Sequence, residues 1–308
     1  MFSRVLVFVL YCVVCIASER QHVCIHGQRE EELTLGVRLS PESDHAAKRE
    51  ATDPRPIRFR PYFDDTVTSN SDSNQREMIQ EVVPAVLSFF STVVSVPPTP
   101  SPVLLDRSCS GGGYYVPEGG STVRRCVDQC VSTTCGGIVT IPDDHLKRCV
   151  QCNNTSPQSL QCSPGVPSTD GAGVADTDYI LYISALPCVE GPTLAFAAAC
   201  QMESQLDRPI AGYINFCPNN LGETTRDYLF QVAKHELFHA LGFSYSLMAL
   251  WRDSSGDRRT PSDQQIPNTV TTVNYATWDT FSGPKEHTVT VLRTEAVLRE
   301  GRGSLWLQ

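Results

Sequence analysis

The sequence has no cluster of lysine and arginine. Its acidic residues outnumber its basic ones by 34 to 25, and the formal net charge is −9. Proteins that hold nucleic acid through its phosphates carry a basic patch or stripe. The charge pattern therefore argues against a nucleic-acid partner.

Long hydrophobic runs are also scarce. The longest follows Arg4, covers 13 residues from Val5 to Ala17, and ends at small residues. Such a run is short for crossing a bilayer, although a signal anchor is the competing interpretation. The pattern is typical of a secretory signal peptide, residues 1–18, cleaved near Ala17–Ser18. Because no other stretch is long and apolar enough to span, we expect a protein of the secretory pathway, secreted or at the cell surface.

Cysteine is abundant, with 13 residues, and this indicates an oxidising compartment. Residues 105–165 are rich in cysteine, glycine, serine and proline. The pair Cys149 and Cys152 has the spacing of half a zinc knuckle or of a redox motif, but in a secreted chain we favour disulfides. Asn153 and Asn154 each begin a glycosylation sequon, which fits a surface loop.

The strongest motif is His235-Glu236-Leu237-Phe238-His239, followed by Gly242. On a helix, His235 and His239 lie one turn apart on one face and can reach the same metal ion. Glu236 is placed to take a proton from a water without being a ligand itself. Zn²⁺, one ion per chain, is the expected cofactor because neutral imidazole is a good zinc ligand. Thr224 or Thr225 is expected to cap the helix.

The rest of the chain predicts an α+β domain. The hydrophobic content of 41% is enough for a sizeable core. Met78 to Phe90 repeats apolar residues at helical spacing, and Pro84 either kinks this helix or marks a fresh start. Alternating or apolar runs predict strands at 56–63, 178–184, 193–200, 211–216 and 289–292.

Residues 19–50 are polar and charged and cannot form a core alone. They contain His22-Val23-Cys24-Ile25-His26. Cys24 is either an ordinary disulfide partner or a latency residue, whose thiolate caps a catalytic zinc until the segment is removed. The dibasic pair Lys48-Arg49 is a candidate processing site.

Together the signal peptide, the cysteine pattern, the segment 22–26 and the motif at 235–244 resemble the leishmanolysin-type metallopeptidases, among them the animal leishmanolysin-like peptidases or invadolysins. Residues 209–218 and 246–253 resemble that family too. The resemblance implies a metzincin-like zinc protease domain at 51–308, its C-terminal part missing, after a propeptide at 19–50. It implies His235 and His239 as zinc ligands, Glu236 as general base, and Cys24 as a cysteine switch. Removing Cys12, Cys15 and Cys24 leaves ten cysteines for pairing.

The sequence departs from the family pattern at the third zinc ligand. The usual third histidine position after Gly242 holds Tyr245 and Ser246, and no histidine follows His287. The segment Glu286-His287-Thr288-Val289 resembles a family segment that lies upstream of the third zinc ligand. A downstream glutamate, Glu286, Glu295 or Glu300, is a weaker alternative. We therefore expect a truncated product with weak or no activity.

Two functions follow. The first is a zinc metalloendopeptidase that cleaves protein or peptide substrates. The alternative is a non-catalytic adhesion protein on a protease scaffold, which the missing ligand motivates. The family's link to cell adhesion and migration leaves an association with membranes or extracellular matrix open.

Overall fold

The computed structural model describes residues 22–25, 35–37, 54–118, 121–153, 161–189, 191–203, 206–253, 255–261, 268–280, 283–295, 297 and 299. The predicted signal peptide, His26 and the Lys48-Arg49 pair lie outside these residues. The chain divides into two compact units at Gly242 and Phe243. The first unit contains the motif helix and the N-terminal segment.

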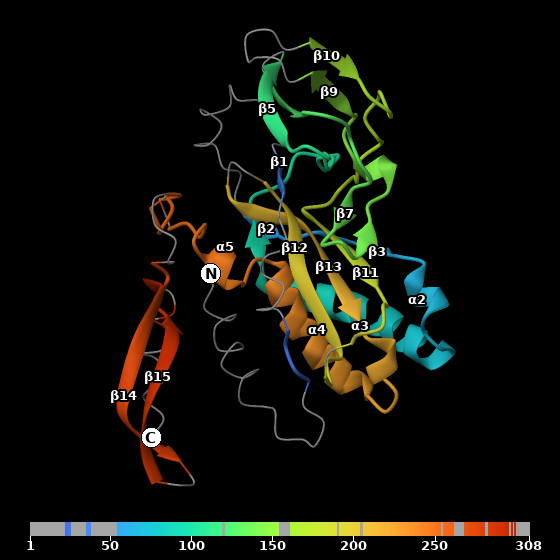
Figure 1. Cartoon of the computed structure of the whole chain (residues 1–308). Coiled ribbons are helices and arrows are strands. Elements are labelled where there is room, and N and C mark those ends of the chain that lie inside the picture. The colour runs from blue at the N-terminus through green and yellow to red at the C-terminus, as the bar shows by residue number, and fades with distance from the viewer. Residues whose placement is uncertain are drawn as a thin grey trace. The chain divides into compact units, whose positions relative to one another are not determined.

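A five-stranded mixed sheet forms the centre of the first unit (Figure 1). Three of its strands run parallel, a fourth is antiparallel to them, and a short N-terminal strand runs parallel to the fourth. In sheet order they are β1 (Leu35–Val37), β12 (Ala195–Glu203), β13 (Arg208–Phe216), β11 (Tyr179–Ser184) and β3 (Phe59–Phe63). The expected strands at 178–184, 193–200 and 211–216 are confirmed, and so is the α+β class with a mixed sheet.

Two long helices, α3 (Ser73–Val93) and α4 (Arg226–Ala240), pack against one face of this sheet. Alternate residues of β11 separate the two faces, as strand geometry requires. Tyr179 and Ile183 face the helices, whereas Tyr182 belongs to the core on the other face. The helix predicted from Met78 to Phe90 buries all seven of its apolar positions, and it continues through Pro84. The short helix α2 (Thr66–Ser69) precedes α3.

The strand expected at 56–63 is confirmed from Phe59 to Phe63, but Pro56 belongs to a separate strand. β2 (Arg55–Pro56) pairs with β4 (Ser95–Val96), while β3 begins at Phe59. Between them the Ile57 N–H bonds the Val94 carbonyl at 3.1 Å. The Arg58 N–H instead bonds the Asp178 carboxylate at 3.0 Å, so the chain changes partners between the two sheets.

A cysteine-rich lobe continues the core on the other face of the sheet. Its four-stranded sheet has the order β10 (Gln161–Pro164), β9 (Val150–Asn153), β6 (Ser121–Cys126) and β5 (Gly113–Glu118). A small hairpin, β7 (Thr134–Cys135) and β8 (Val139–Thr140), and the turn η4 (Asp143–His145) complete it.

Four disulfides hold this lobe: Cys109–Cys126, Cys130–Cys149, Cys135–Cys200 and Cys152–Cys162. Cys149 and Cys152 bond to different partners, which confirms the disulfide interpretation over a zinc knuckle or a redox pair. The Cys135–Cys200 bond ties the lobe to β12. A disulfide stabilises a loop-rich segment of this kind largely by constraining its unfolded state.

The second unit contains α5 (Tyr245–Met248) and an antiparallel hairpin of β14 (Val270–Thr280) and β15 (Gly283–Leu292). Only residues 289–292 were expected as strand, so the prediction missed β14 and most of β15. In the part of the chain that the structure describes, no helix has the length and apolarity to cross a membrane.

Candidate metal centre

Helix α4 begins where its sequence allows a cap. Thr225 is the N-cap, and its hydroxyl accepts a hydrogen bond from the Tyr228 N–H at 3.3 Å. The buried face carries the expected apolar residues, among them Leu229, Val232 and Leu237. Gly242 follows the helix with a φ of 99°, a left-handed conformation that glycine adopts without steric cost. The predicted helix and its end are thus confirmed.

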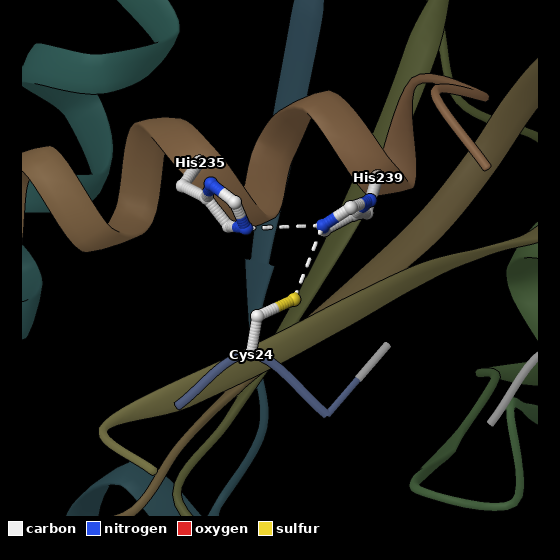
Figure 2. Close-up of side chains that lie close together, drawn as sticks. All are labelled: Cys24, His235 and His239. Atoms are coloured by element: carbon white, nitrogen blue, oxygen red, sulfur yellow. Dashed lines mark hydrogen bonds between the residues drawn. The ribbon is translucent and has the colours of Figure 1, made fainter. Parts of the chain in front are cut away.

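The two histidines of the motif point toward one another on a half-buried face of α4. His235 Nε2 and His239 Nε2 lie 3.1 Å apart. Cys24 Sγ lies 3.4 Å from His239 Nε2, although 215 residues separate the two in sequence (Figure 2). All three donor atoms fall within 4.8 Å of one another. Cys24 is outside the five disulfides and keeps its thiol.

Two of the three separations between these donor atoms suit a tetrahedral metal ion. Zinc takes imidazole nitrogen at about 2.0–2.1 Å and thiolate sulfur at about 2.3 Å, so tetrahedral donors lie about 3.3 Å apart for N–N and about 3.6 Å for N–S. The distances of 3.1 and 3.4 Å are within roughly 0.2 Å of these values. Among the described residues, these three form the one group of metal-binding side chains this close. Two imidazoles with one thiolate are a donor set that zinc prefers.

Glu236 is fully buried beside the histidines. Its Oε1 lies 2.9 Å from His22 Nε2, whereas its Oε2 has no hydrogen-bond partner within the described part of the chain. A buried carboxylate oxygen without a partner is costly, and in native proteins it often marks a reactive group or a water site. The environment suits a proton acceptor.

The segment His22–Ile25 is held by residues of α4 and of the loop before β12. The His22 N–H bonds the Tyr228 hydroxyl at 2.9 Å, and the Val23 carbonyl accepts from the Thr193 hydroxyl at 2.9 Å. Ile25 is 5% exposed and belongs to the core of the cysteine-rich face. Further along, β1 pairs with β12 from Leu35 to Val37. Contacts with the rest of the first unit therefore hold this segment in place on both sides of Cys24.

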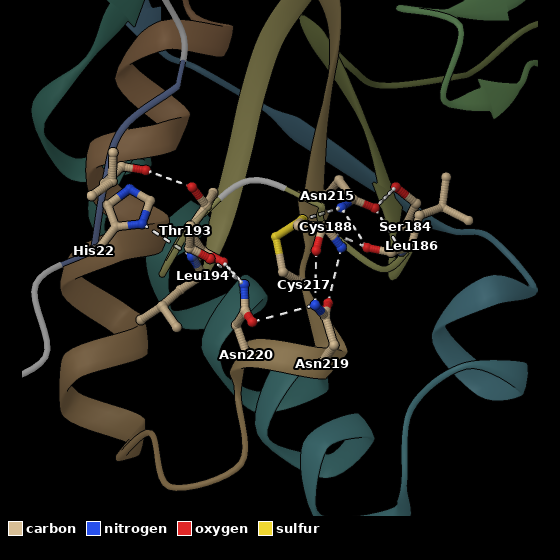
Figure 3. Close-up of a disulfide and its surroundings, with 12 residues drawn as sticks. His22, Ser184, Leu186, Cys188, Thr193, Leu194, Asn215, Cys217, Asn219 and Asn220 are labelled. Atoms are coloured by element: carbon tan, nitrogen blue, oxygen red, sulfur yellow. Dashed lines mark hydrogen bonds between the residues drawn. A yellow bond between two sulfur atoms is a disulfide. The ribbon is translucent and has the colours of Figure 1, made fainter.

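The loop that carries Thr193 and Leu194 is fixed by a cluster of asparagines and the fifth disulfide, Cys188–Cys217 (Figure 3). Asn220 Nδ2 donates to the Thr193 carbonyl at 2.7 Å. Asn219 binds the main chain of Cys188 through both ends of its amide, at 2.9 and 2.8 Å. No sequence pattern marks these asparagines, because only their contacts identify their role.

The C-terminal end of α4 is tied to the sheet by a buried tyrosine. The Tyr179 hydroxyl donates to the carbonyl of Ala240 at 2.6 Å, one residue after His239. Burial raises the pKa of Tyr179 well above its ordinary value, so the hydroxyl keeps its proton. Gly212 makes this contact possible, since a Cβ there would collide with the Tyr179 hydroxyl. The sequence predicted a strand at 179 but gave no signal for this hydrogen bond.

An ion pair fixes the start of β11. Asp178 is fully buried and accepts from Arg58 Nε at 2.9 Å and from the Thr99 N–H at 2.9 Å. Burial alone would raise the pKa of Asp178, but the hydrogen bonds from Arg58 and Thr99 outweigh it and lower that pKa to about 2. The carboxylate therefore stays charged at neutral pH and joins β3, β11 and the segment after β4.

The candidate third ligands of the sequence analysis lie in the second unit. His287 and Glu286 are on β15, where His287 stands opposite Tyr275 in the ladder. Glu295 follows β15, and Glu300 lies outside the described residues. Among the described residues, the group of close metal-binding side chains contains Cys24, His235 and His239.

A helix with the H-E-x-x-H motif, packed against a mixed sheet and flanked by disulfide-rich loops, is the arrangement of a metzincin-like domain. Comparison with known proteins then identifies the family. The profile of the leishmanolysin family matches residues 147–278. The chain belongs to the leishmanolysin family of metallopeptidases.

Several relatives are similar to part or most of the chain. A leishmanolysin-like peptidase of Drosophila pseudoobscura pseudoobscura is 33% identical over 81% of this chain and 39% of its own length. One from Caenorhabditis elegans is 32% identical over 96% of this chain and 48% of its own length. A ciliated left-right organizer metallopeptidase of Xenopus laevis is 42% identical over 38% of this chain and 16% of its own length. The chain thus spans less than half the length of these relatives.

Proposed function

We propose that this chain forms the metal-binding and general-base part of a zinc-dependent endopeptidase, held latent by its own N-terminal segment. The proposal rests on one observation. Two imidazoles one helical turn apart and a thiol from a distant segment bring three metal-binding atoms within 4.8 Å of one another. Membership of a metallopeptidase family gives the arrangement its chemistry.

Each residue then has a separate role. His235 and His239 would hold the metal, and a zinc ion bound there would supply Lewis acidity for the attacking water and the peptide carbonyl. Glu236 accepts the proton of the attacking water and returns it to the leaving amine. Its burial and its unpartnered Oε2 support this role, because a desolvated carboxylate has few competing hydrogen bonds.

Cys24 explains latency in physical terms. A catalytic zinc site uses three protein ligands and leaves one position open, whereas a thiolate in that position closes it. The contacts of Tyr228 and Thr193 with the segment hold Cys24 beside His239. Removal of residues 19–50 would open the position.

The open form would then have two lasting ligands in the described structure. Two imidazoles hold zinc less well than three ligands do, and each ligand contributes roughly 3 kcal/mol to zinc binding. We therefore propose that this 308-residue chain binds zinc with Cys24 in place and has weak or no peptidase activity. Protein and peptide substrates, and a secretory or cell-surface location, are proposed on the family's chemistry. The disulfides support the location, and the expected signal peptide at residues 1–18 agrees with it.

Elemental analysis of the purified chain tests the ligand set. Wild type should retain one zinc per chain, and Cys24→Ser should bind zinc roughly a hundredfold more weakly, because one ligand is lost. Val23→Ala is the matched control, since the Val23 side chain is 47% exposed and adjacent to Cys24. Equal zinc affinity in Cys24→Ser and wild type would remove Cys24 from the set.

Peptide cleavage tests the role of Glu236 and the proposed shortage of zinc ligands. Cys24→Ser should show little cleavage, and Glu236→Gln added to it should abolish what remains without changing zinc content. Efficient cleavage by Cys24→Ser with tightly held zinc would contradict the proposed shortage of ligands. Cleavage that survives Glu236→Gln would remove Glu236 as the base.

A further inference from the structure

His22 lies in the docked segment two residues before Cys24, and both of its ring nitrogens have partners. Figure 3 shows the contact of one of them with Leu194. Its Nδ1 accepts a hydrogen bond from the Leu194 N–H at 3.2 Å. Its Nε2 lies 2.9 Å from Glu236 Oε1. The side chains of His22 and Glu236 are 6% and 0% exposed, so water competes little for this contact.

These two contacts fix the tautomer of the ring. A main-chain N–H can only donate, so Nδ1 must be the unprotonated nitrogen that accepts from Leu194. In a neutral imidazole the proton is then on Nε2, which donates it to the Glu236 carboxylate. The contact is a hydrogen bond to a charged acceptor, which is stronger than one between neutral groups.

The groups around the ring form a pocket for a neutral imidazole. The Leu194 N–H is held in place because the Leu194 carbonyl accepts from the Cys217 N–H at 2.9 Å. An apolar side chain in the pocket would leave both Leu194 and Glu236 without partners. A lysine would supply a donor for Glu236 but no acceptor for Leu194. The pocket therefore selects a side chain with an acceptor on one edge and a donor on the other.

We propose that this pocket is a second inhibitory site, in which the His22 imidazole occupies the carboxylate of the general base while Cys24 occupies the metal. The ligand it fits is an extended peptide with a neutral imidazole two residues before a thiol. The inference rests on the proposed role of Glu236 as the base. The two contacts are separate, because the pocket is made by Leu194 and Glu236 and contains no metal-binding atom of the described group.

Amide hydrogen exchange of the full chain tests the pocket without any measurement of activity. The Leu194 N–H should be protected in wild type, with or without zinc. His22→Phe keeps an aromatic ring but removes both nitrogens, and it should speed exchange at Leu194 about fivefold, as expected for the loss of a hydrogen bond to the neutral His22 Nδ1. His22→Gln, which can still donate to Glu236, should fall between the two.

A double-variant cycle tests whether His22 and Glu236 act through the same contact. Glu236→Gln should raise Leu194 exchange by less than His22→Phe does, because a neutral acceptor remains. The double variant should exchange as fast as His22→Phe alone. Val23→Ala is the matched control and should match wild type. Wild-type exchange in His22→Phe, or rate increases that multiply in the double variant, would overturn the proposal.

The metal contact of Cys24 is tested independently of the His22 pocket. If zinc leaves the alkylation rate of Cys24 unchanged in wild type, the proposed metal contact fails, while the exchange data in the metal-free protein still decide the pocket. An Nε2–H tautomer for His22 in nitrogen-resolved NMR spectra supports the pocket, and the Nδ1–H tautomer would refute it.

Discussion

Tyr179→Phe perturbs the junction between the central sheet and the metal-binding helix. The variant removes only the hydroxyl that donates to the Ala240 carbonyl at 2.6 Å. Loss of a buried hydrogen bond that leaves its acceptor without a partner costs about 1–3 kcal/mol. For a unit of this size that lowers Tm by a few degrees. Because Ala240 follows His239 directly, the last turn of α4 should also loosen.

The assay has two parts. Thermal unfolding measures the stability loss, and amide exchange at Leu241 and Gly242 measures opening of the last turn, since both N–H groups bond to carbonyls within α4. Zinc affinity should fall in proportion, because His239 would be held less rigidly. No measurement of peptidase activity is needed.

Tyr182→Phe is the matched control. Tyr182 lies on the same strand, is equally buried, and bonds His145 Nδ1 at 2.8 Å on the opposite face of the sheet. It should lose similar stability but keep wild-type exchange at Leu241 and wild-type zinc affinity. If Tyr179→Phe and Tyr182→Phe change zinc affinity equally, the reasoning about the helix end is wrong.

Two further predictions concern the sheet. Asp178→Asn should destabilise the first unit by about 2 kcal/mol at pH 7, from a folded pKa near 2 against an ordinary 3.8. Because the folded pKa is lowered, wild type should keep this stability above about pH 4 and lose it as pH falls toward 2; equal acid unfolding of the two proteins would refute the ion pair. Gly212→Ala should destabilise by about 1–3 kcal/mol, because its Cβ would meet the Tyr179 hydroxyl. Gly222→Ala, with open space around its Cβ, should match wild type in urea unfolding; a loss as large as that of Gly212→Ala would show that the cost is not steric.

The spacing of apolar residues along the sequence predicted the long helix α3 and the buried strands β11 and β13. The seven apolar positions of α3 and the buried runs of β11 and β13 are continuous signals, and the structure confirms them. β14 carries no such signal, because Val270-Thr271-Thr272-Val273 mixes polar and apolar residues without alternation. The break at Ile57 and Arg58 was missed because it depends on Asp178, which is distant in sequence.

The candidate site also has parts that the sequence predicts and parts that it does not. His235, Glu236 and His239 are a local motif and could be read directly. Cys24 was proposed as a latency residue, and the structure brings its thiol to His239. The contacts of His22, Leu194 and Tyr179 join residues between 61 and 214 positions apart, so no local pattern encodes them. Long-range hydrogen bonds of this kind are visible only in the folded protein.

The pairing of β1 with β12 has a consequence for release of the N-terminal segment. β1 covers the main chain of β12 from Gln201 to Glu203, at the margin of the sheet. Once β1 departs, amide and carbonyl groups of β12 lose their partners and become a template for another extended chain. A substrate can fill that template, but so can a second copy of the protein. If the segment is removed as we propose, the shortened protein should therefore self-associate more readily than the full chain.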